Sequence, residues 1–452
     1  MRTSGNHQRG SLALVAMAFS AVIAITLAGY IALSYESYQH SSRLLQLTRT
    51  KRLAESGLEE ALWALNNSDW STQTWTVSGT DIACTLPTVG IGEGAQGTVA
   101  ITIHNYTSPS SPTIASTATV DLPAGGQLVR TLTATTKAAP LFVNALASAY
   151  GNNGSITLTS GTLVDSWNSN PSGDGTTFVP YSTPGSYNTA ANCAAIVAAP
   201  NIALGSATVY GYAVTFGNSI TTSFNAKVKG PTTASSTKID KNRVGKSAFV
   251  PAFAVAVPAS YTVTGNLDGS NQTIGTPNGG TEYWSSPTDL VLNGTTLTVQ
   301  GPVVIIVHGS LSLYNAAKIV INATGRSRAE IFVSSDVAIG INPHASTAWL
   351  DNLSSLPRNL VIYSTSTAST RQFNYYSTQS FCGVLYSAAP APIVFDTGTN
   401  NAITGAVFAN ENITVVSGSR PQFHYDTYLQ SLDKTWFKGI TTPYLVVQVS
   451  ES

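Results

Sequence analysis

An uncharged, apolar run near the N-terminus constrains this chain more than any other feature. It covers residues 11–34, contains no proline, and precedes the first acidic residue, Glu36. At about 1.5 Å per residue, a helix of this length is roughly 36 Å long, enough to cross the apolar core of a bilayer. The apolar region of a cleaved secretory signal has only about 7–15 residues. The run therefore predicts one membrane-spanning helix that stays in the mature protein.

The same helix is predicted to continue beyond the membrane. The first proline of the chain is Pro87, and apolar residues recur at steps of three and four from Leu44 to Leu65, which is the spacing of an amphipathic helix. Residues 66–69 (NNSD) are a typical stop signal. A continuous helix over residues 11–66 would be roughly 84 Å long, which is more than a simple anchor requires.

The charges that flank the apolar run favour a cytoplasmic N-terminus. Arg2 and Arg9 precede the run, and basic residues tend to stay on the cytoplasmic side of a membrane. Most of the chain is then expected on the other side. The basic residues between Arg43 and Arg52 oppose this orientation.

The composition excludes several classes of partner. Only 10% of the residues are charged and the net charge is +0, so no electrostatic attraction to nucleic acid or to anionic membranes is expected. The hydrophobic fraction of 43% argues against a disordered chain. Cys84, Cys193 and Cys382 lie far apart. They allow one disulfide, but their spacing is not that of a metal site.

Residues 71–138 are predicted to form a small module of β-strands. Val99, Ile101 and Ile103 alternate with polar residues in TVAITIHNY, and two further strands flank the turn at residues 123–126 (PAGG).

Beyond Pro140 a short sequence pattern recurs: a brief apolar strand, a polar turn, and a second strand in which alternate positions are apolar. Gly383 and Gly405 begin two such units and are 22 residues apart, near the length of one coil of a parallel β-helix. We therefore expect a mainly β protein with a right-handed parallel β-helix, and an antiparallel sandwich is the alternative. The pattern is weakest over residues 225–288. The units are residues 147–158, 195–204, 211–223, 302–313, 329–339, 383–395 and 405–416.

Equivalent places in these units predict the packing of the core. Ile305, Phe332, Leu385 and Val407 occupy like places and are expected to stack in one interior column.

The first 70 residues resemble the N-terminus of type IV pilin-like proteins, in particular PilX-type minor pilins. The resemblance rests on a short basic leader that ends in Gly10, the apolar run, and a helix that closes on AESGLEEALWAL. In that family a prepilin peptidase cuts after the glycine, which implies cleavage of the Gly10–Ser11 bond here. It also implies an inner-membrane location, with the bulk of the chain periplasmic or extracellular, and other pilin-like subunits as partners.

Two departures from the major pilins matter. Those proteins usually begin with an aromatic residue and carry glutamate at the fifth mature position, whereas this chain has Ser11 and Val15. The departures imply a minor or initiating subunit. The alternative is a single-pass anchor that is not processed.

The second half of the chain resembles an uncharacterised β-helical domain that follows PilX-type N-termini in bacterial envelope proteins. This resemblance implies a fold and a location, and no chemistry. It rests on LVDSWNS (163–169), LTVQGPVVIIVHGSLSL (297–313), IGIN (339–342) and FHYD (423–426). The expected division of the chain is a leader (1–10), the helix (11–70), a small β-module (71–138), the β-helix (139–432) and a C-terminal segment (433–452).

Catalytic groups are sparse in this domain. A glycosidase needs two carboxylates that face each other, and a lyase needs a calcium cluster with a basic residue, but the aspartates occur singly. We therefore expect no enzyme activity and no cofactor, with a surface-anchored polysaccharide hydrolase or lyase as the rival function. The aspartates are Asp165, Asp174, Asp336, Asp351, Asp396 and Asp426.

One segment resembles the first half of a calcium loop. Asn168, Asn170 and Asp174 lie in NSNPSGDG, but Val179 stands where the terminal glutamate belongs. A turn built on Asx side chains is the better interpretation, so no metal is expected.

The expected role of the β-helix is display on the cell surface, for adhesion or partner contact. Tyr375 and Tyr376, in the segment RQFNYYSTQ, are the candidate contact residues for a glycan or a surface protein, and packing in the core or a turn is the alternative. With few charges available, such binding is expected to depend little on salt.

Overall fold

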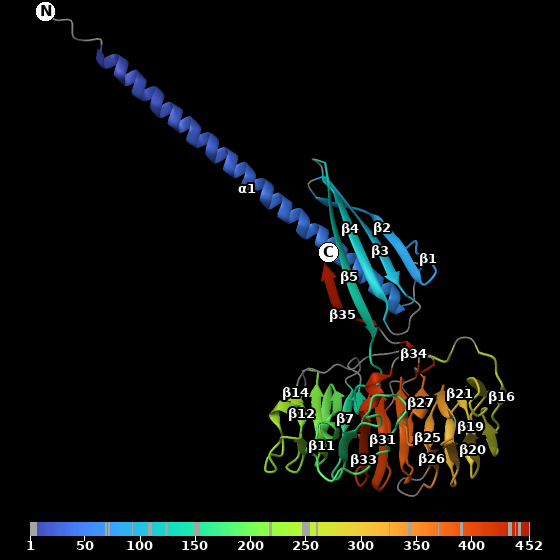
Figure 1. The fold of residues 1–452 in the computed structure, drawn as a ribbon. Helices are drawn as coiled ribbons and strands as arrows, with labels where there is room; N and C mark the ends of the chain where they lie inside the picture. Colours follow the sequence, from blue (N-terminus) through green and yellow to red (C-terminus); the bar gives the residue numbers. More distant parts are fainter. Residues whose placement is uncertain are drawn as a thin grey trace, which may run out of the picture. The chain divides into compact units, whose positions relative to one another are not determined.

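The computed structural model describes most of residues 7–451. It does not describe residues 68–69, 71–72, 93, 107–110, 123–124, 149–153, 217–218, 246–253, 259–260, 325, 342–345, 367, 369, 389–391, 433–435, 439 and 442–443, nor the side chains of residues 7–13, 254, 399, 440 and 441. The chain forms two compact units (Figure 1). We call residues 1–137 with 444–452 the helix–sheet unit, and residues 138–443 the coil domain.

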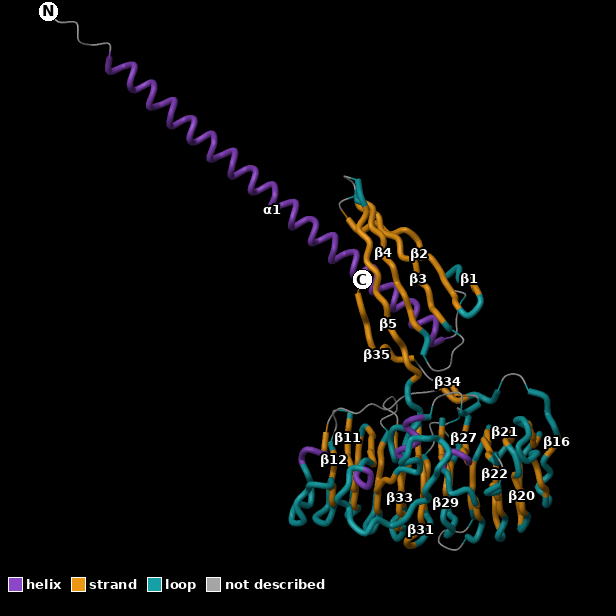
Figure 2. The backbone as a smooth tube through the Cα atoms, viewed as in Figure 1, coloured by secondary structure: helices purple, strands orange, loops and turns teal. Residues whose placement is uncertain are grey.

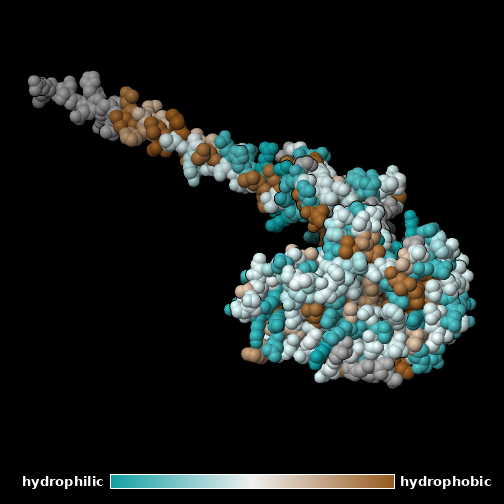
Figure 3. All heavy atoms as spheres, turned by 60° about the horizontal axis from the view of Figure 1, so that its bottom comes forward, coloured by the Kyte–Doolittle hydropathy of each residue, from teal (hydrophilic) through white to brown (hydrophobic). Residues whose placement is uncertain are grey.

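A single long helix, α1 (His7–Asn67), begins the helix–sheet unit. Every described side chain from residue 14 to residue 40 is exposed, and an 18-residue window of this part has a mean hydropathy of 2.2. Figure 3 shows apolar residues gathered along it. The helix is long and apolar enough to cross a membrane. The prediction of one continuous helix that ends near residue 66 is confirmed.

The second half of α1 packs against an antiparallel sheet. Strands β1 to β5 are neighbours in chain order. Alternate residues of β3 and β4 are buried, as expected for a sheet with one covered face. The strands are β1 (Thr76–Ser78), β2 (Asp81–Gly92), β3 (Ala95–His104), β4 (Thr113–Asp121), β5 (Gln127–Ala138) and, beside β5, β35 (Tyr444–Glu451).

Small residues allow this close packing. Ala54, Ala61 and Ala64 are fully buried on α1. A Cβ atom on Gly57 would lie only 2.3 Å from Ser116 Oγ of β4, and Ser116 Oγ donates a hydrogen bond to the Ala54 carbonyl at 2.8 Å. The backbone of the helix therefore lies directly against side chains of the sheet at Gly57 and Ala54.

The coil domain consists mainly of three parallel sheets. The largest contains β16 (Gly265–Asn266), β18 (Glu282–Ser286), β21 (Pro302–Val307), β24 (Arg328–Val333), β27 (Leu360–Ser364), β29 (Phe381–Ser387), β31 (Thr399–Ala409), β33 (Arg420–Asp426), β8 (Leu163–Trp167), β11 (Thr208–Thr215), β9 (Ala195–Ala199), β6 (Leu146–Ser148), β13 (Lys227–Lys229) and β14 (Val244–Gly245). The second contains β12 (Ile220–Thr221), β10 (Asn201–Ala203), β7 (Ser155–Thr157), β32 (Ile413–Val415), β30 (Ile393–Phe395), β28 (Phe373–Tyr375), β25 (Val337–Ile339), β22 (Leu311–Tyr314) and β19 (Leu290–Asn293). The third contains β17 (Gln272–Ile274), β20 (Thr296–Val299), β23 (Lys318–Ile321) and β26 (Trp349–Asn352).

Smaller elements complete the domain. They are the antiparallel pair β15 (Ala254–Val255) and β34 (Ile440–Thr441) and the short 3₁₀ helices η2 (Ala191–Cys193), η3 (Lys241–Arg243), η4 (Pro357–Asn359) and η5 (Thr427–Ser431).

Successive strands visit the parallel sheets in turn, so the chain forms stacked coils. From β17 to β25 the order is third sheet, largest sheet, second sheet, repeated. After β26 each coil adds strands to the largest and second sheets. Gly383 and Gly405 are register partners, as their spacing of 22 residues predicts.

The chain enters this stack in the middle (Figure 2). It winds from β7 and β8 to one end at β14, resumes at the opposite end with β16, and winds back until β32 and β33 pair with β7 and β8. The first and last strands of the domain are therefore neighbours. This order explains how β35 returns to the sheet of the helix–sheet unit, so the C-terminal segment is not a separate piece and the coil domain is an insertion between β5 and β35.

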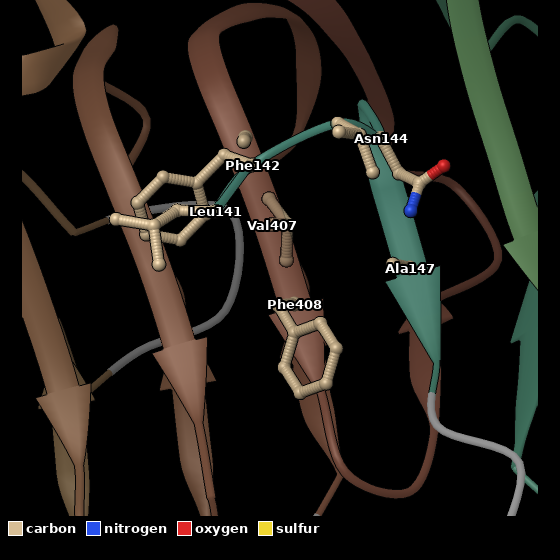
Figure 4. Close-up of a pocket in the computed structure, with 8 residues that line it drawn as sticks. Leu141, Phe142, Asn144, Ala147, Val407 and Phe408 are labelled. Carbon is tan, nitrogen blue, oxygen red and sulfur yellow. The ribbon is translucent and has the colours of Figure 1, made fainter. Parts of the chain in front are cut away.

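The segment that precedes β6 (residues 141–145), here called the leading segment, packs on β31. In Figure 4, Leu141 and Phe142 lie beside Val407 and Phe408. The Val407 N–H donates to the Ala145 carbonyl at 2.9 Å, so β31 is bonded to the leading segment as well as to its neighbours in the sheet.

The predicted interior column is correct at three of its four positions. Ile305, Leu385 and Val407 belong to one column of register partners, which Ile331 and Ile362 complete. Phe332 is in the adjacent column, where its ring stacks on Tyr363 with centroids 4.7 Å apart. Every residue of β21 is buried, so burial does not alternate and cannot distinguish two registers that differ by one residue.

Removing one methyl group from this column should have a measurable cost. Ile362 is fully buried, so Ile362→Val is expected to lower the free energy of unfolding by about 0.5–1.5 kcal/mol in urea titrations. Ile341→Val makes the same chemical change at a side chain that is 52% exposed and serves as the matched control. Equal effects of the two variants would contradict the proposed packing of Ile362.

Candidate functional site

The first and last strands of the coil domain bring a buried histidine and aspartate together. The register of β33 and β8 pairs His424 with Asp165, and both side chains are at most 2% exposed. His424 Nδ1 lies 2.7 Å from Asp165 Oδ1. The two residues belong to the segments FHYD and LVDSWNS, which the sequence analysis singled out. Their proximity was not predicted.

Two tyrosines from the segment that follows β8 complete this cluster. The hydroxyls of Tyr181 and Tyr187 donate to Asp165 Oδ2 at 2.9 and 3.1 Å. The Tyr181 ring stacks on His424 with centroids 3.8 Å apart, and Tyr187 stacks on Tyr210 at 3.5 Å. Burial, and then the charge of Asp165, raise the pKa of both tyrosines, so both remain hydroxyl donors at neutral pH.

This arrangement joins the coils and engages both oxygens of Asp165. The carboxylate is therefore not available as a nucleophile toward a sugar. Cys193 donates its thiol to the Tyr187 carbonyl at 3.4 Å, and burial raises its pKa, which disfavours a reactive thiolate. The cluster is a buried polar network that links the beginning and the end of the domain.

The calcium-loop candidates form turns. Asn168 Oδ1 accepts from the Asn170 N–H at 2.9 Å, and Asn170 Oδ1 accepts from Ser172 Oγ at 3.3 Å. Asp174 Oδ1 accepts from the N–H groups of Thr176 and Thr177, both at 2.8 Å. These backbone donors hold the Asp174 pKa below its usual value. Local hydrogen bonds thus use the oxygens that a cation would need.

Three of the remaining four candidate aspartates are also engaged with protein groups. Asp426 Oδ1 accepts from the Ser169 and Tyr428 N–H groups, Asp336 forms an exposed ion pair with Arg371, and Asp396 accepts from Ser419. The absence of enzyme activity stays a prediction.

The three cysteines are free. Cys84 lies in β2 of the helix–sheet unit, whereas Cys193 and Cys382 belong to the coil domain.

The prediction that Tyr375 contacts a partner is wrong. Tyr375 ends β28 and is fully buried, where its ring lies 5.9 Å from Phe381 and from Phe395. Its hydroxyl donates to the Gln379 carbonyl at 3.2 Å. Tyr376 is half-buried, and its role as a contact residue stays a prediction. The Gly10–Ser11 bond lies within α1, where the side chains are outside the described residues.

A cavity in the coil domain, with three arginines in its lining, was not predicted from the sequence. The cavity has a volume of about 790 Å³. Its walls come from the segment after β8, from the corners before β18, β21, β24 and β27, and from the segment after η5. We call it the arginine cavity. Its lining includes Arg326, Arg328, Arg358, Phe178 and Trp436.

Aromatic rings hold Arg358 in place. Its guanidinium carbon lies 4.1 Å from the ring centroid of Phe178, 4.5 Å from that of Trp436 and 5.3 Å from that of Tyr428. Burial lowers the Arg358 pKa, an effect that Tyr428 and Asp426 oppose. Arg328 donates to the Trp436 carbonyl at 3.0 Å. These residues are scattered between Phe178 and Trp436, so no local motif could have identified them.

Comparison with known proteins adds one similarity. A family model described as "Domain of unknown function (DUF7305)" matches residues 256–432. This range contains β16 to β33 and includes His424, Arg326, Arg328 and Arg358, but not Asp165. No curated protein and no solved structure matches the chain. The similarity to this domain is therefore confined to the part of the coil domain that winds back from β16 to the middle of the stack.

Proposed function

We propose that this protein is a minor pilin-like subunit of a type IV pilus or a related filament or secretion system. In this proposal α1 anchors the subunit in the inner membrane and later packs with other pilin-like subunits. The coil domain, displayed in the periplasm or outside the cell, serves adhesion or partner contact. The rival, a polysaccharide hydrolase or lyase, has no specific observation in its favour.

The observation that carries the proposal is the division of α1 into two parts. Its first part is apolar and exposed, whereas its second part is buried against a sheet through Ala54, Gly57 and Ala61. A simple anchor needs only the first part. A subunit that leaves the membrane and stacks in a filament needs both, because the apolar part must find new partners.

The topology of the coil domain suits a displayed insert. Because its first and last coils are neighbours, it can extend from the sheet between β5 and β35 without separating those strands. We also propose that the stacked coils form a right-handed parallel β-helix, since crossovers between parallel strands are right-handed in about 98% of cases.

Cleavage at Gly10 tests the filament assignment. In cells that contain a prepilin peptidase, the mature protein is expected to begin at Ser11, as mass spectrometry of its N-terminal peptide would show. Gly10→Leu should abolish cleavage, because the peptidase must accept a residue without a side chain at this place.

Gly29→Leu provides the control for this experiment. Gly29 lies in the same helix with open space around it, so a leucine there should leave cleavage intact. A wild-type protein that keeps residues 1–10 would contradict the filament assignment and leave only a single-pass anchor.

A further inference from the structure

The arginine cavity carries an excess of positive charge. Its described lining residues include three arginines and no aspartate or glutamate. Within the described part of the chain, Arg326, Arg328 and Arg358 form no ion pair. The nearest carboxylates act from outside the lining: Asp426 on Arg358, and Glu330 on Arg328. Both are buried, and Asp426 already accepts two backbone hydrogen bonds.

Two buried donors in the wall have no acceptor. Arg358 Nε and Trp436 Nε1 are inaccessible to solvent and lack a hydrogen-bond partner. Leaving such a donor unsatisfied costs about 1–3 kcal/mol. The aromatic rings around Arg358 hold the guanidinium without consuming its N–H groups. Because these two atoms are closed to solvent, an acceptor in the cavity meets the guanidinium group of the exposed Arg326 first.

The shape of the cavity fits an extended ligand. Corners of four successive coils, before β18, β21, β24 and β27, contribute to its walls. Neighbouring strands are about 4.8 Å apart, so these corners extend over roughly 14 Å. The volume of about 790 Å³ lies within the range of about 300–1,000 Å³ that is usual for small-molecule sites.

We propose that the arginine cavity binds a carboxylated sugar, such as a uronic acid unit of an acidic polysaccharide. The planar carboxylate matches the fork of a guanidinium group. The lining also has apolar side chains, among them Phe178, Leu353 and Leu356, against which the C–H groups of a pyranose can pack. A bare phosphate would satisfy the arginines but would leave this apolar part of the lining uncovered. This inference rests on the part of the proposed function that assigns binding to the coil domain, and is independent of the filament.

Binding of oligosaccharides to the full-length protein in detergent tests the inference. The probes are a trigalacturonate and its fully methyl-esterified form, which has the same rings and no charge. The acid should bind at least 10-fold more tightly than the ester and should change the tryptophan fluorescence. Its affinity should fall severalfold between 50 mM and 500 mM NaCl, because salt screens exposed charge. This differs from the weak salt dependence that the overall composition predicts, because three arginines gather in one lining.

Variants locate the site. Arg326 is exposed, so Arg326→Ala should keep the fold and weaken binding of the acid about 10-fold. Arg358→Lys keeps the charge but loses the planar fork, and should have a similar effect. Arg371→Ala removes an arginine of the same domain that is paired with Asp336, and should leave binding unchanged.

Four results would overturn the inference: equal affinity for acid and ester, equal losses in Arg371→Ala and Arg326→Ala, displacement of the sugar by inorganic phosphate at similar affinity, or no binding. The third result would define a simple anion site. None of them alters the outcome of the Gly10 experiment, so the filament assignment fails or stands separately.

Discussion

Asp165→Ala is expected to lower the free energy of unfolding of the coil domain by about 3–5 kcal/mol. The substitution removes an acceptor that His424, Tyr181 and Tyr187 share. His424, which is 2% exposed, loses its partner in a place that water hardly reaches, and an unsatisfied buried polar group is costly. Tyr181 and Tyr187 are half-buried, so each adds less to the loss. The loss should appear in urea titrations of the full-length protein. It should also appear as faster hydrogen exchange in β8 and β33, which this cluster joins.

Two variants make this prediction specific. Asp165→Asn retains one oxygen acceptor and the size of the side chain, and should lose less stability than Asp165→Ala. Asp268→Ala removes a carboxylate whose hydrogen bonds stay within an exposed turn at Ser270, and should cost less than about 1 kcal/mol. If Asp165→Ala were as mild as Asp268→Ala, the buried cluster would not hold the two ends of the domain together.

Much of the fold could be predicted because its signals are local. The absence of proline before Pro87 and the apolar run predict α1, and the repeat of 22 residues predicts stacked coils. The face of α1 was harder to predict. Ala61 and Leu65 of the predicted apolar stripe are buried, but Leu44 is 64% exposed. The structure also buries Ala54 and Gly57, because close contact with a sheet requires small residues.

The order of the coils could not be predicted. Pairing of β33 with β8 joins residues about 260 positions apart, and such a contact leaves no periodic signal in the sequence. For the same reason His424 and Asp165 appeared as separate motifs. Only the knowledge that β33 pairs with β8 would have placed the two residues side by side.

Tyr375 shows how composition can mislead. Its segment is rich in polar residues, which favoured the interpretation of Tyr375 as a contact residue. Phe373 and Tyr375 are buried, and Asn374 between them is not, which is the two-residue period of a strand. That alternation was present in the sequence, but it is only three residues long, so the polar context outweighed it.

Glu330 should make the stability of the coil domain depend on pH. The side chain is 3% exposed on β24, and burial raises its pKa to about 7. The N–H of Lys438, 2.7 Å from Glu330 Oε2, and the charges of Arg328 and Lys438 oppose this shift. The ordinary value is 4.5, so the unfolded chain loses this proton first. The proton on Glu330 therefore makes its full contribution to the free energy of unfolding below about pH 4.5. This contribution is lost as the pH rises to about 7.

Glu330→Gln is expected to abolish this loss. Glutamine is neutral at every pH and still offers an oxygen to the Lys438 N–H. A shift of this size corresponds to about 3 kcal/mol, so urea titrations should show the variant more stable than the wild type by up to that amount at pH 8, with the difference vanishing at pH 4. Glu282→Gln on β18, which is separated from β24 by β21 in the same sheet, should behave in the opposite way, because hydrogen bonds from Thr276 and Trp284 lower the Glu282 pKa. A difference between Glu330→Gln and the wild type that stays constant from pH 4 to pH 8 would mean that Glu330 titrates at its ordinary pKa and that its burial is relieved in solution.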